Sequence, residues 1–163
     1  IIKERRMEYY RYMSDISGPA VAVIEDIDYP DCIGAYWGEI NTKVHKAFGL
    51  SGALTNGVVR DLGDLAEDFP VVAGSIGPSH GFVHVREIDT PVTFFGIRVS
   101  PNDLIHADLH GAVVIPNDVI STLKDAIHQL FASEKLILDP AGKKEFNFDD
   151  FKSAWEDFEK SRT

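Results

Sequence analysis

The sequence has little cysteine and comparatively little positive charge. A single cysteine, Cys32, excludes an internal disulfide and a thiolate cluster for zinc, so we expect a reducing compartment, with the cytoplasm as the default. The 16 Lys and Arg residues against 26 Asp and Glu give a formal net charge of −10, which argues against a nucleic-acid partner bound through a broad basic face. No apolar run approaches the roughly 20 residues that span a bilayer, so we expect no membrane association.

The length and apolar content favour one folded core. With 163 residues and 44% hydrophobic content, the chain can bury one sizeable core but is short for two ordinary domains. We therefore expect a single domain over residues 1–163, with a helical C-terminal part at 117–163.

Apolar periodicity predicts an α/β protein with a β-rich middle. Asn117 is the expected cap of the third helix, and Asn147 or Asp149 that of the fourth. Helices are expected at 3–14, 41–48, from 117 to about 131, and from about 148 to 160. Strands are expected at 20–24, 52–55, 71–73, 81–85, 91–95, 104–107 and 112–115.

The most informative cluster is Arg60-Asp61-Leu62-Gly63-Asp64. If Asn56-Gly57 turns the chain into a helix near Val59, Arg60, Asp61 and Asp64 gather at its first turn, where free N–H groups favour an anion. The Arg60 guanidinium can bind a carboxylate with two hydrogen bonds, and Asp61 offers a hard oxygen ligand for Mg²⁺ or Mn²⁺. Asp64 could orient either group. An RDxxD cluster can equally be a solvated ion-pair face.

Two further features have a functional and a structural interpretation. In Trp37-Gly38-Glu39-Ile40-Asn41 the glycine permits close backbone approach, and free N–H groups could hold a second anionic oxygen, although the segment can also be an ordinary loop into a helix. The histidine pairs at 80 and 84 and at 106 and 110 have a spacing that suits zinc on a helix, but both lie where strands and turns are expected.

Several blocks together resemble the RraA-like family. They are YWGEIN, GALTNGVVRDLGDL, PVVAGSIGPS and TPVTFFGIRVSPNDLIHADLHGAVVIP, which extend, with the residues between them, over roughly Gly18 to Pro116. This family includes class II 4-hydroxy-4-methyl-2-oxoglutarate aldolases, which also decarboxylate oxaloacetate, and the regulator of ribonuclease activity A. The resemblance implies a swivelling β/β/α domain, followed here by C-terminal helices, that assembles as a homotrimer or a hexamer with active sites between subunits.

The same resemblance implies roles for individual residues. Arg60 matches the family's substrate-binding and catalytic arginine, Asp61 its ligand for Mg²⁺ or Mn²⁺, and Asp64 the acidic catalytic residue that closes the motif. The family's substrate-binding segment falls on Gly38, Glu39, Ile40 and Asn41. Asn56 and Asn102 stand where many members have aspartate and glycine, and we expect the family's usual N-terminal segment to be missing.

The implied activity is a metal-dependent lyase reaction. Such an enzyme cleaves 4-hydroxy-2-oxo acids to pyruvate or decarboxylates oxaloacetate, in each case through a pyruvate enolate. A Schiff-base aldolase is disfavoured, because no lysine lies in an apolar strand that would lower its pKa. Two alternatives stay open: a non-catalytic regulator that binds a ribonuclease, and a relative that retains only the fold.

Overall fold

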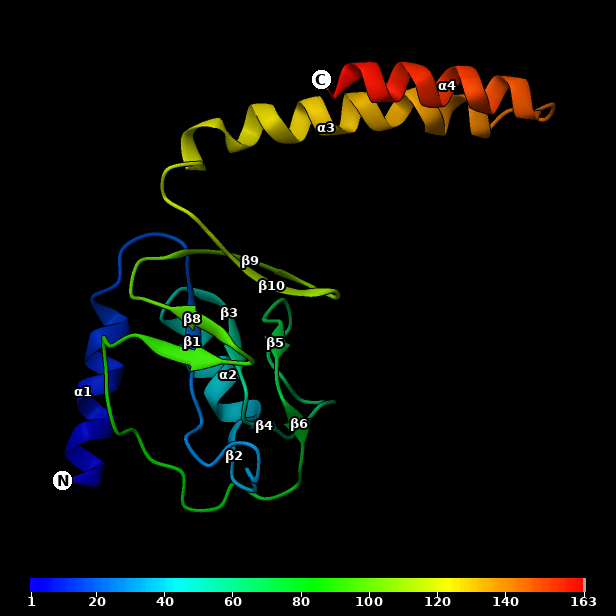
Figure 1. Cartoon of the computed structure of the whole chain (residues 1–163). Helices are drawn as coiled ribbons and strands as arrows, with labels where there is room; N and C mark the ends of the chain where they lie inside the picture. Colours follow the sequence, from blue (N-terminus) through cyan, green and yellow to red (C-terminus); the bar gives the residue numbers. More distant parts are fainter. Residues whose placement is uncertain (163) are drawn as a thin grey trace. The chain divides into compact units, whose positions relative to one another are not determined.

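The computed structural model describes residues 1–162, and the chain forms two compact units, Ile1–Val114 and Ile115–Thr163 (Figure 1). The boundary lies close to residue 117, where the helical C-terminal part is expected to begin. That residues 1–163 act as one domain stays a prediction.

The first unit is built around two three-stranded parallel sheets. One sheet has the order β1 (Ala20–Ile24), β3 (Leu50–Thr55), β5 (Val71–Val72). The other has the order β2 (Ala35–Trp37), β4 (Val58–Val59), β6 (Ser75–Ile76). Two strand pairs follow, β7 (Val92–Phe94) with β8 (Ile97–Val99) and β9 (Leu104–Asp108) with β10 (Gly111–Ile115). The helices of this unit are α1 (Ile2–Ser14) and α2 (Glu39–Ala47).

The two parallel sheets share one hydrophobic core. Trp37 of β2 is fully buried, and it belongs to the same cluster as Met13 of α1, Ala53 of β3 and Val59 of β4. Burial of this kind is the main stabilising contribution to a fold. It fixes the carboxyl ends of β2 and β4 side by side, which is where the GEIN and RDLGD segments begin.

The chain passes from one sheet to the other at Asn56-Gly57, a dipeptide that favours positive φ angles and hence a tight turn. Neither residue has a positive φ angle here, so the preference of the dipeptide does not decide the conformation. Asn56 is 5% exposed, and its side chain accepts a hydrogen bond from the Asp26 N–H (2.7 Å) and donates one to the Asp26 carbonyl (3.1 Å). The Asn56 side chain therefore pairs with both backbone groups of the partly buried Asp26.

Other expectations also need correction. Residues 60–66 form turns and no helix, because Asp61 has a φ angle of +56° and cannot continue a right-handed helix. Residues 81–85 form no strand, whereas β2, β4, β6 and β8 were not expected. The third helix begins at Ile120 after Val119, which makes no side-chain cap, so Asn117 is not the cap.

The second unit is a helical hairpin of α3 (Ile120–Ala141) and α4 (Phe148–Ser161), which lie side by side (Figure 1). The expected cap at Asn147 is confirmed, since its side chain accepts hydrogen bonds from the N–H groups of Asp149 and Asp150. The Asp150 carboxylate accepts from the Asn147 N–H in return, which completes a capping box. Within the described residues, no helix combines the length and apolar content needed to cross a membrane.

Candidate functional site

Arg60 and Asp61 follow directly after β4. The Arg60 N–H donates to the Trp37 carbonyl (2.9 Å), so the pairing of β4 with β2 extends one residue beyond the strand. Neighbouring side chains of a strand point to opposite faces, but the left-handed backbone of Asp61 breaks that alternation. As a result Arg60 Nη1 and Asp61 Oδ2 lie 2.8 Å apart, and the two charged groups share one side of the chain.

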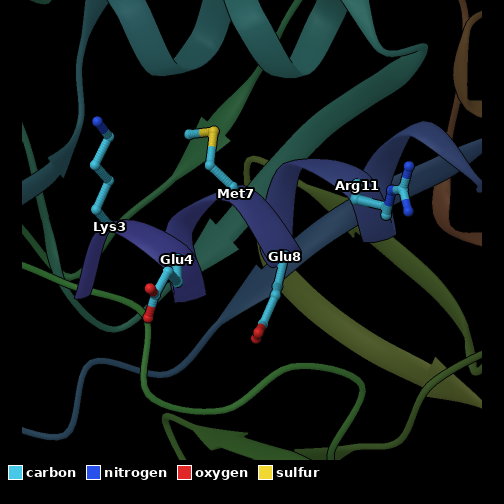
Figure 2. A pocket seen from close by; sticks show the side chains of 5 residues that line it. All are labelled: Lys3, Glu4, Met7, Glu8 and Arg11. Atoms are coloured by element: carbon cyan, nitrogen blue, oxygen red, sulfur yellow. The ribbon is translucent and has the colours of Figure 1, made fainter. Parts of the chain in front are cut away.

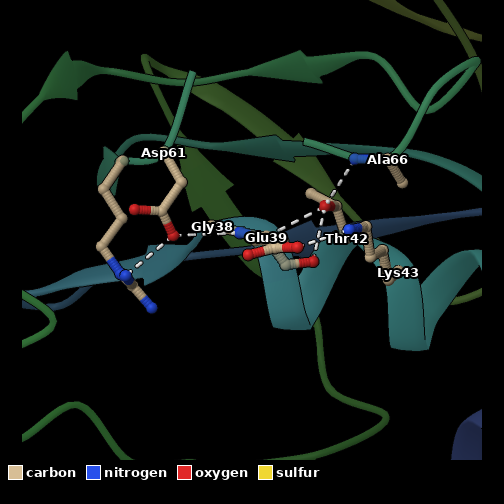
Figure 3. Close-up of polar contacts among 7 residues, drawn as sticks. Gly38, Glu39, Thr42, Lys43, Asp61 and Ala66 are labelled. Carbon is tan, nitrogen blue, oxygen red and sulfur yellow. Dashed lines mark hydrogen bonds and ion pairs between the residues drawn. The ribbon is translucent and has the colours of Figure 1, made fainter. Parts of the chain in front are cut away.

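The N-terminus of α2 faces this pair (Figure 3). Gly38 is the N-cap and has no side chain, so the Asp61 carboxylate takes over the capping role: its Oδ2 accepts a hydrogen bond from the Glu39 N–H at 3.1 Å. A Cβ atom on Gly38 would lie 2.6 Å from the same oxygen. The helix terminus expected near Val59 is thus supplied by α2, from another part of the sequence.

The first turn of α2 offers backbone donors. Within the described residues, the N–H groups of Ile40 and Asn41 have no hydrogen-bond partner, and they lie at the positive end of the helix dipole. The side chains of this segment are used differently. Asn41 Nδ2 donates to the Tyr36 carbonyl, the Glu39 carboxylate pairs with Lys43, and the Ile40 side chain is 67% exposed.

The pair keeps unused hydrogen-bonding capacity. The side chains of Arg60 and Asp61 are 24% and 30% exposed, so both are partly accessible. In the part of the chain that the structure describes, Asp61 Oδ1 makes no hydrogen bond and the buried Nε of Arg60 lacks a partner. A carboxylate oxygen beside a guanidinium suits a cation and an anionic ligand bound together.

Residues 1–162 contain no group of three or more His, Cys, Asp or Glu side chains arranged to hold a metal ion. A cation at Asp61 would therefore take its other ligands from water and substrate, a coordination that Mg²⁺ commonly adopts. The two histidine pairs form no such group, and His80 and His84 each place Nδ1 beside a backbone carbonyl of their own loop.

Asp64 lies apart from the other predicted site residues. Its N–H donates to the Asp61 carbonyl (2.9 Å), but its carboxylate is exposed and makes no hydrogen bond to any described residue. The structure thus joins Arg60, Asp61, Gly38 and Glu39 by direct contacts and leaves the Asp64 side chain free in solvent.

A buried histidine that the sequence did not single out anchors α2. His45 is fully buried, and its Nδ1 lies 2.6 Å from the Asn41 carbonyl, which can only accept, so Nδ1 carries the proton. Its Nε2 lies 2.8 Å from the Tyr9 hydroxyl and accepts from it. Burial lowers the pKa of His45, against a smaller opposing effect of the Asn41 carbonyl, so the ring is held neutral.

Two surface hollows lie away from these residues. One, of about 420 Å³, runs along α1 and is lined by Lys3, Glu4, Met7, Glu8 and Arg11 (Figure 2). Its charges are of both signs and Glu8 is paired with Arg5, which is typical of a solvated helix face. The other, of about 500 Å³, lies beside Asn56 and the turn between β7 and β8. Neither is lined by Arg60 or Asp61.

Together, the paired parallel sheets and the Arg-Asp turn facing a helix N-terminus define an α/β protein with a candidate site at Arg60 and Asp61. A family model described as RraA-like, Aldolase/RraA, matches residues 3–114, and the chain belongs to this family. The family predicted from the sequence blocks is confirmed.

Some relatives of the chain are named as aldolases and others as RNase inhibitors. A putative 4-hydroxy-4-methyl-2-oxoglutarate aldolase of Halalkalibacterium halodurans is 30% identical over 88 residues, which are 53% of this chain and 42% of the relative. The solved structure of Streptomyces coelicolor RraAS2, described as an unusual member of the RNase ES inhibitor RraA protein family, has a TM-score of 0.65 at 22% identity and covers 77% of this chain and 65% of its own.

An uncharacterised protein from Pseudomonas syringae pv. tomato has a solved structure with a TM-score of 0.68 at 22% identity, covering 94% of this chain and 67% of its own. At 22% identity the two solved structures show similarity of fold alone. They confirm the expected RraA-like α/β fold with C-terminal helices. The chain spans half or less of the length of the curated relatives that it matches.

Proposed function

We propose that the chain is a divalent-metal-dependent lyase that forms pyruvate from 4-hydroxy-2-oxo acids, by aldol cleavage, or from oxaloacetate, by decarboxylation. The observation that carries this proposal is the Arg60-Asp61 pair, turned to one side of the chain and facing the N-terminus of α2. The aldolase name of the Halalkalibacterium halodurans relative supports the same reaction class.

The hydrogen-bond donors at this site suit the carboxylate of a 2-oxo acid. The 1-carboxylate of a 2-oxo acid accepts hydrogen bonds from the Arg60 guanidinium and from the free N–H groups of Ile40 and Asn41. Asp61 would hold Mg²⁺ or Mn²⁺, which would supply a Lewis acid for the 2-oxo group. Gly38 leaves room for this arrangement because it has no side chain to push Asp61 away.

The reaction breaks the C3–C4 bond of the substrate. The bonding electron pair moves into the 2-oxo group, and negative charge collects on the oxygen of the resulting pyruvate enolate. Arg60 stabilises that charge, because its guanidinium remains protonated throughout turnover and is already in position. In aldol cleavage a water molecule oriented by the exposed Asp64 carboxylate takes the proton of the 4-hydroxyl group as C4 becomes a carbonyl, whereas loss of CO₂ from oxaloacetate requires no such base. In both reactions C3 of the enolate then takes up a proton from water to give pyruvate.

The proposed enzyme is a homotrimer or hexamer with its sites between subunits. Apolar side chains beside the site support this assembly: Ile40 is 67% exposed, Leu62 56% and Ile76 70%. Exposed apolar side chains of this size favour burial against another protein surface.

The test is metal-dependent pyruvate release from oxaloacetate, measured with a coupled assay and corrected for the reaction without protein. Arg60→Ala and Asp61→Ala are each expected to lower turnover by a factor of about 100 or more, because each removes a charged group from the site, while circular dichroism stays unchanged. Arg98→Ala, on the exposed side of β8, is the matched control and should behave like wild type.

Two outcomes would contradict the proposal. Wild-type turnover in either site variant removes the assignment of the site, and full activity in excess EDTA favours a Schiff-base mechanism. If the wild-type protein releases no pyruvate but inhibits a ribonuclease, the second function of the family applies. The Streptomyces coelicolor structure, by its description, represents that branch.

A further inference from the structure

Thr42 joins the two halves of the candidate site through a buried hydroxyl. It lies on the face of α2 that meets the loop after Asp61, and it is fully buried (Figure 3). The Oγ1–H group donates to the Gly38 carbonyl at 3.0 Å and has the Glu39 carbonyl as a second acceptor at 3.1 Å. The same Oγ1 accepts a hydrogen bond from the Ala66 N–H at 3.0 Å. One oxygen therefore bonds to both segments.

The two segments meet a second time at Asp61. The Glu39 N–H donates to Asp61 Oδ2, and the Asp64 N–H donates to the Asp61 carbonyl within the loop that ends at Ala66. These bonds and the Thr42 hydroxyl close a ring between the start of α2 and residues 61–66. Such a ring holds Asp61 in its left-handed conformation, which a non-glycine residue adopts only when its surroundings maintain it.

An ordinary helical threonine would not need the contact with Ala66. Threonine inside a helix commonly donates to a carbonyl four residues earlier, and that bond alone has local effects. Ala66, however, is 8% exposed, and its N–H has the Thr42 oxygen as its partner. Loss of the hydroxyl would leave a buried N–H unpaired in the loop that carries Asp61, which is costly.

We propose that Thr42 is a positioning residue that sets the distance between the N-terminus of α2 and the Arg60-Asp61 pair. The inference rests on the proposed function, since it concerns the same site. Thr42 touches neither substrate nor cation. It acts through Glu39 on one side and through Ala66 on the other.

The test compares Thr42→Val, which keeps the shape and removes the hydroxyl, with Thr42→Ser, which keeps the hydroxyl. In Thr42→Val we expect amide hydrogen exchange in residues 61–66 to be about tenfold faster than in wild type. We also expect its Mn²⁺ affinity and kcat to fall about tenfold, with little change in KM. Thr42→Ser should stay within about twofold of wild type in all of these measurements.

Thr55→Val is the matched control. Thr55 is 2% exposed, and its Oγ1 accepts from the Gly57 N–H at 3.0 Å, so the variant loses a similar bond outside the ring. Thr55→Val should lower the thermal stability but leave amide exchange in residues 61–66, Mn²⁺ affinity and kcat as in wild type. If Thr42→Val gives this same result, the positioning role is refuted. If wild type neither binds Mn²⁺ nor releases pyruvate, the proposed function fails, and the exchange rates alone decide the inference.

Discussion

Replacing Gly38 by alanine should open the candidate site by displacing Asp61. The φ angle of Gly38 is −170°, an extended conformation that alanine can adopt, so the backbone itself gives no strain. A Cβ atom at this position would lie 2.6 Å from Asp61 Oδ2, 3.0 Å from Arg60 Cγ and 3.1 Å from Arg60 Cζ. The first distance is shorter than any real contact of a Cβ atom, so the Asp61 carboxylate has to move.

The size of the effect follows from the bonds that Asp61 loses. Movement of the carboxylate breaks its hydrogen bond from Glu39 and weakens the pairing with Arg60. One charge-assisted hydrogen bond and mild overpacking at a partly exposed position together cost about 1 to 2 kcal/mol of the free energy of unfolding. We therefore expect a fall in Tm of about 3 to 8 °C, and a fall in Mn²⁺ affinity of about tenfold or more because Asp61 is the proposed ligand.

Calorimetric unfolding and Mn²⁺ titration check both numbers. The control is Gly63→Ala, the same substitution in the loop after Asp61, where a Cβ atom meets nothing within 4 Å and the φ angle is not left-handed. A Gly38→Ala protein with the Mn²⁺ affinity and turnover of Gly63→Ala would refute the reasoning, because Asp61 would then tolerate displacement or have no part in the site.

Two further predictions concern His45 and Asp64. Burial lowers the pKa of His45 below its ordinary value of 6.5, so on acidification the unfolded chain takes up a proton before the native protein does. The free energy of unfolding should then decline below about pH 6.5, by up to about 1.4 kcal/mol per pH unit. Denaturant titrations at several pH values should show a weaker decline in His45→Gln than in wild type. The same decline in both proteins would contradict the account. Asp64→Asn should slow aldol cleavage of 4-hydroxy-4-methyl-2-oxoglutarate about 100-fold while oxaloacetate decarboxylation stays within about threefold, and equal losses in the two assays would remove Asp64 from the proton transfer.

Several helices and strands could be predicted from the sequence. The helices at residues 2–14 and 148–161 and the strand at 20–24 were expected close to their observed bounds, and so was the cap at Asn147. In these segments the local pattern, the turn residues and the tertiary packing agree. The family could also be predicted, because several spaced motifs carry it.

The local geometry of the site could not be predicted from the same reasoning. The segment RDLGDLA has helix-like spacing, but parallel pairing of β4 with β2 and the left-handed Asp61 decide its conformation. Such pairing joins residues far apart in the chain, and local propensity does not report it. For the same reason the bond from Ala66 to Thr42 has no signal in the sequence beyond a threonine four residues after Gly38.

The most direct test of the central claim is a crystal structure of the protein grown with Mn²⁺ and oxalate, a planar mimic of the pyruvate enolate. We expect an anomalous Mn²⁺ peak beside Asp61 Oδ1 and an oxalate carboxylate bound to Arg60 and the N–H groups that begin α2. A structure in which Arg60 and Asp61 stay paired as they are here, with Mn²⁺ and oxalate bound elsewhere, would contradict it.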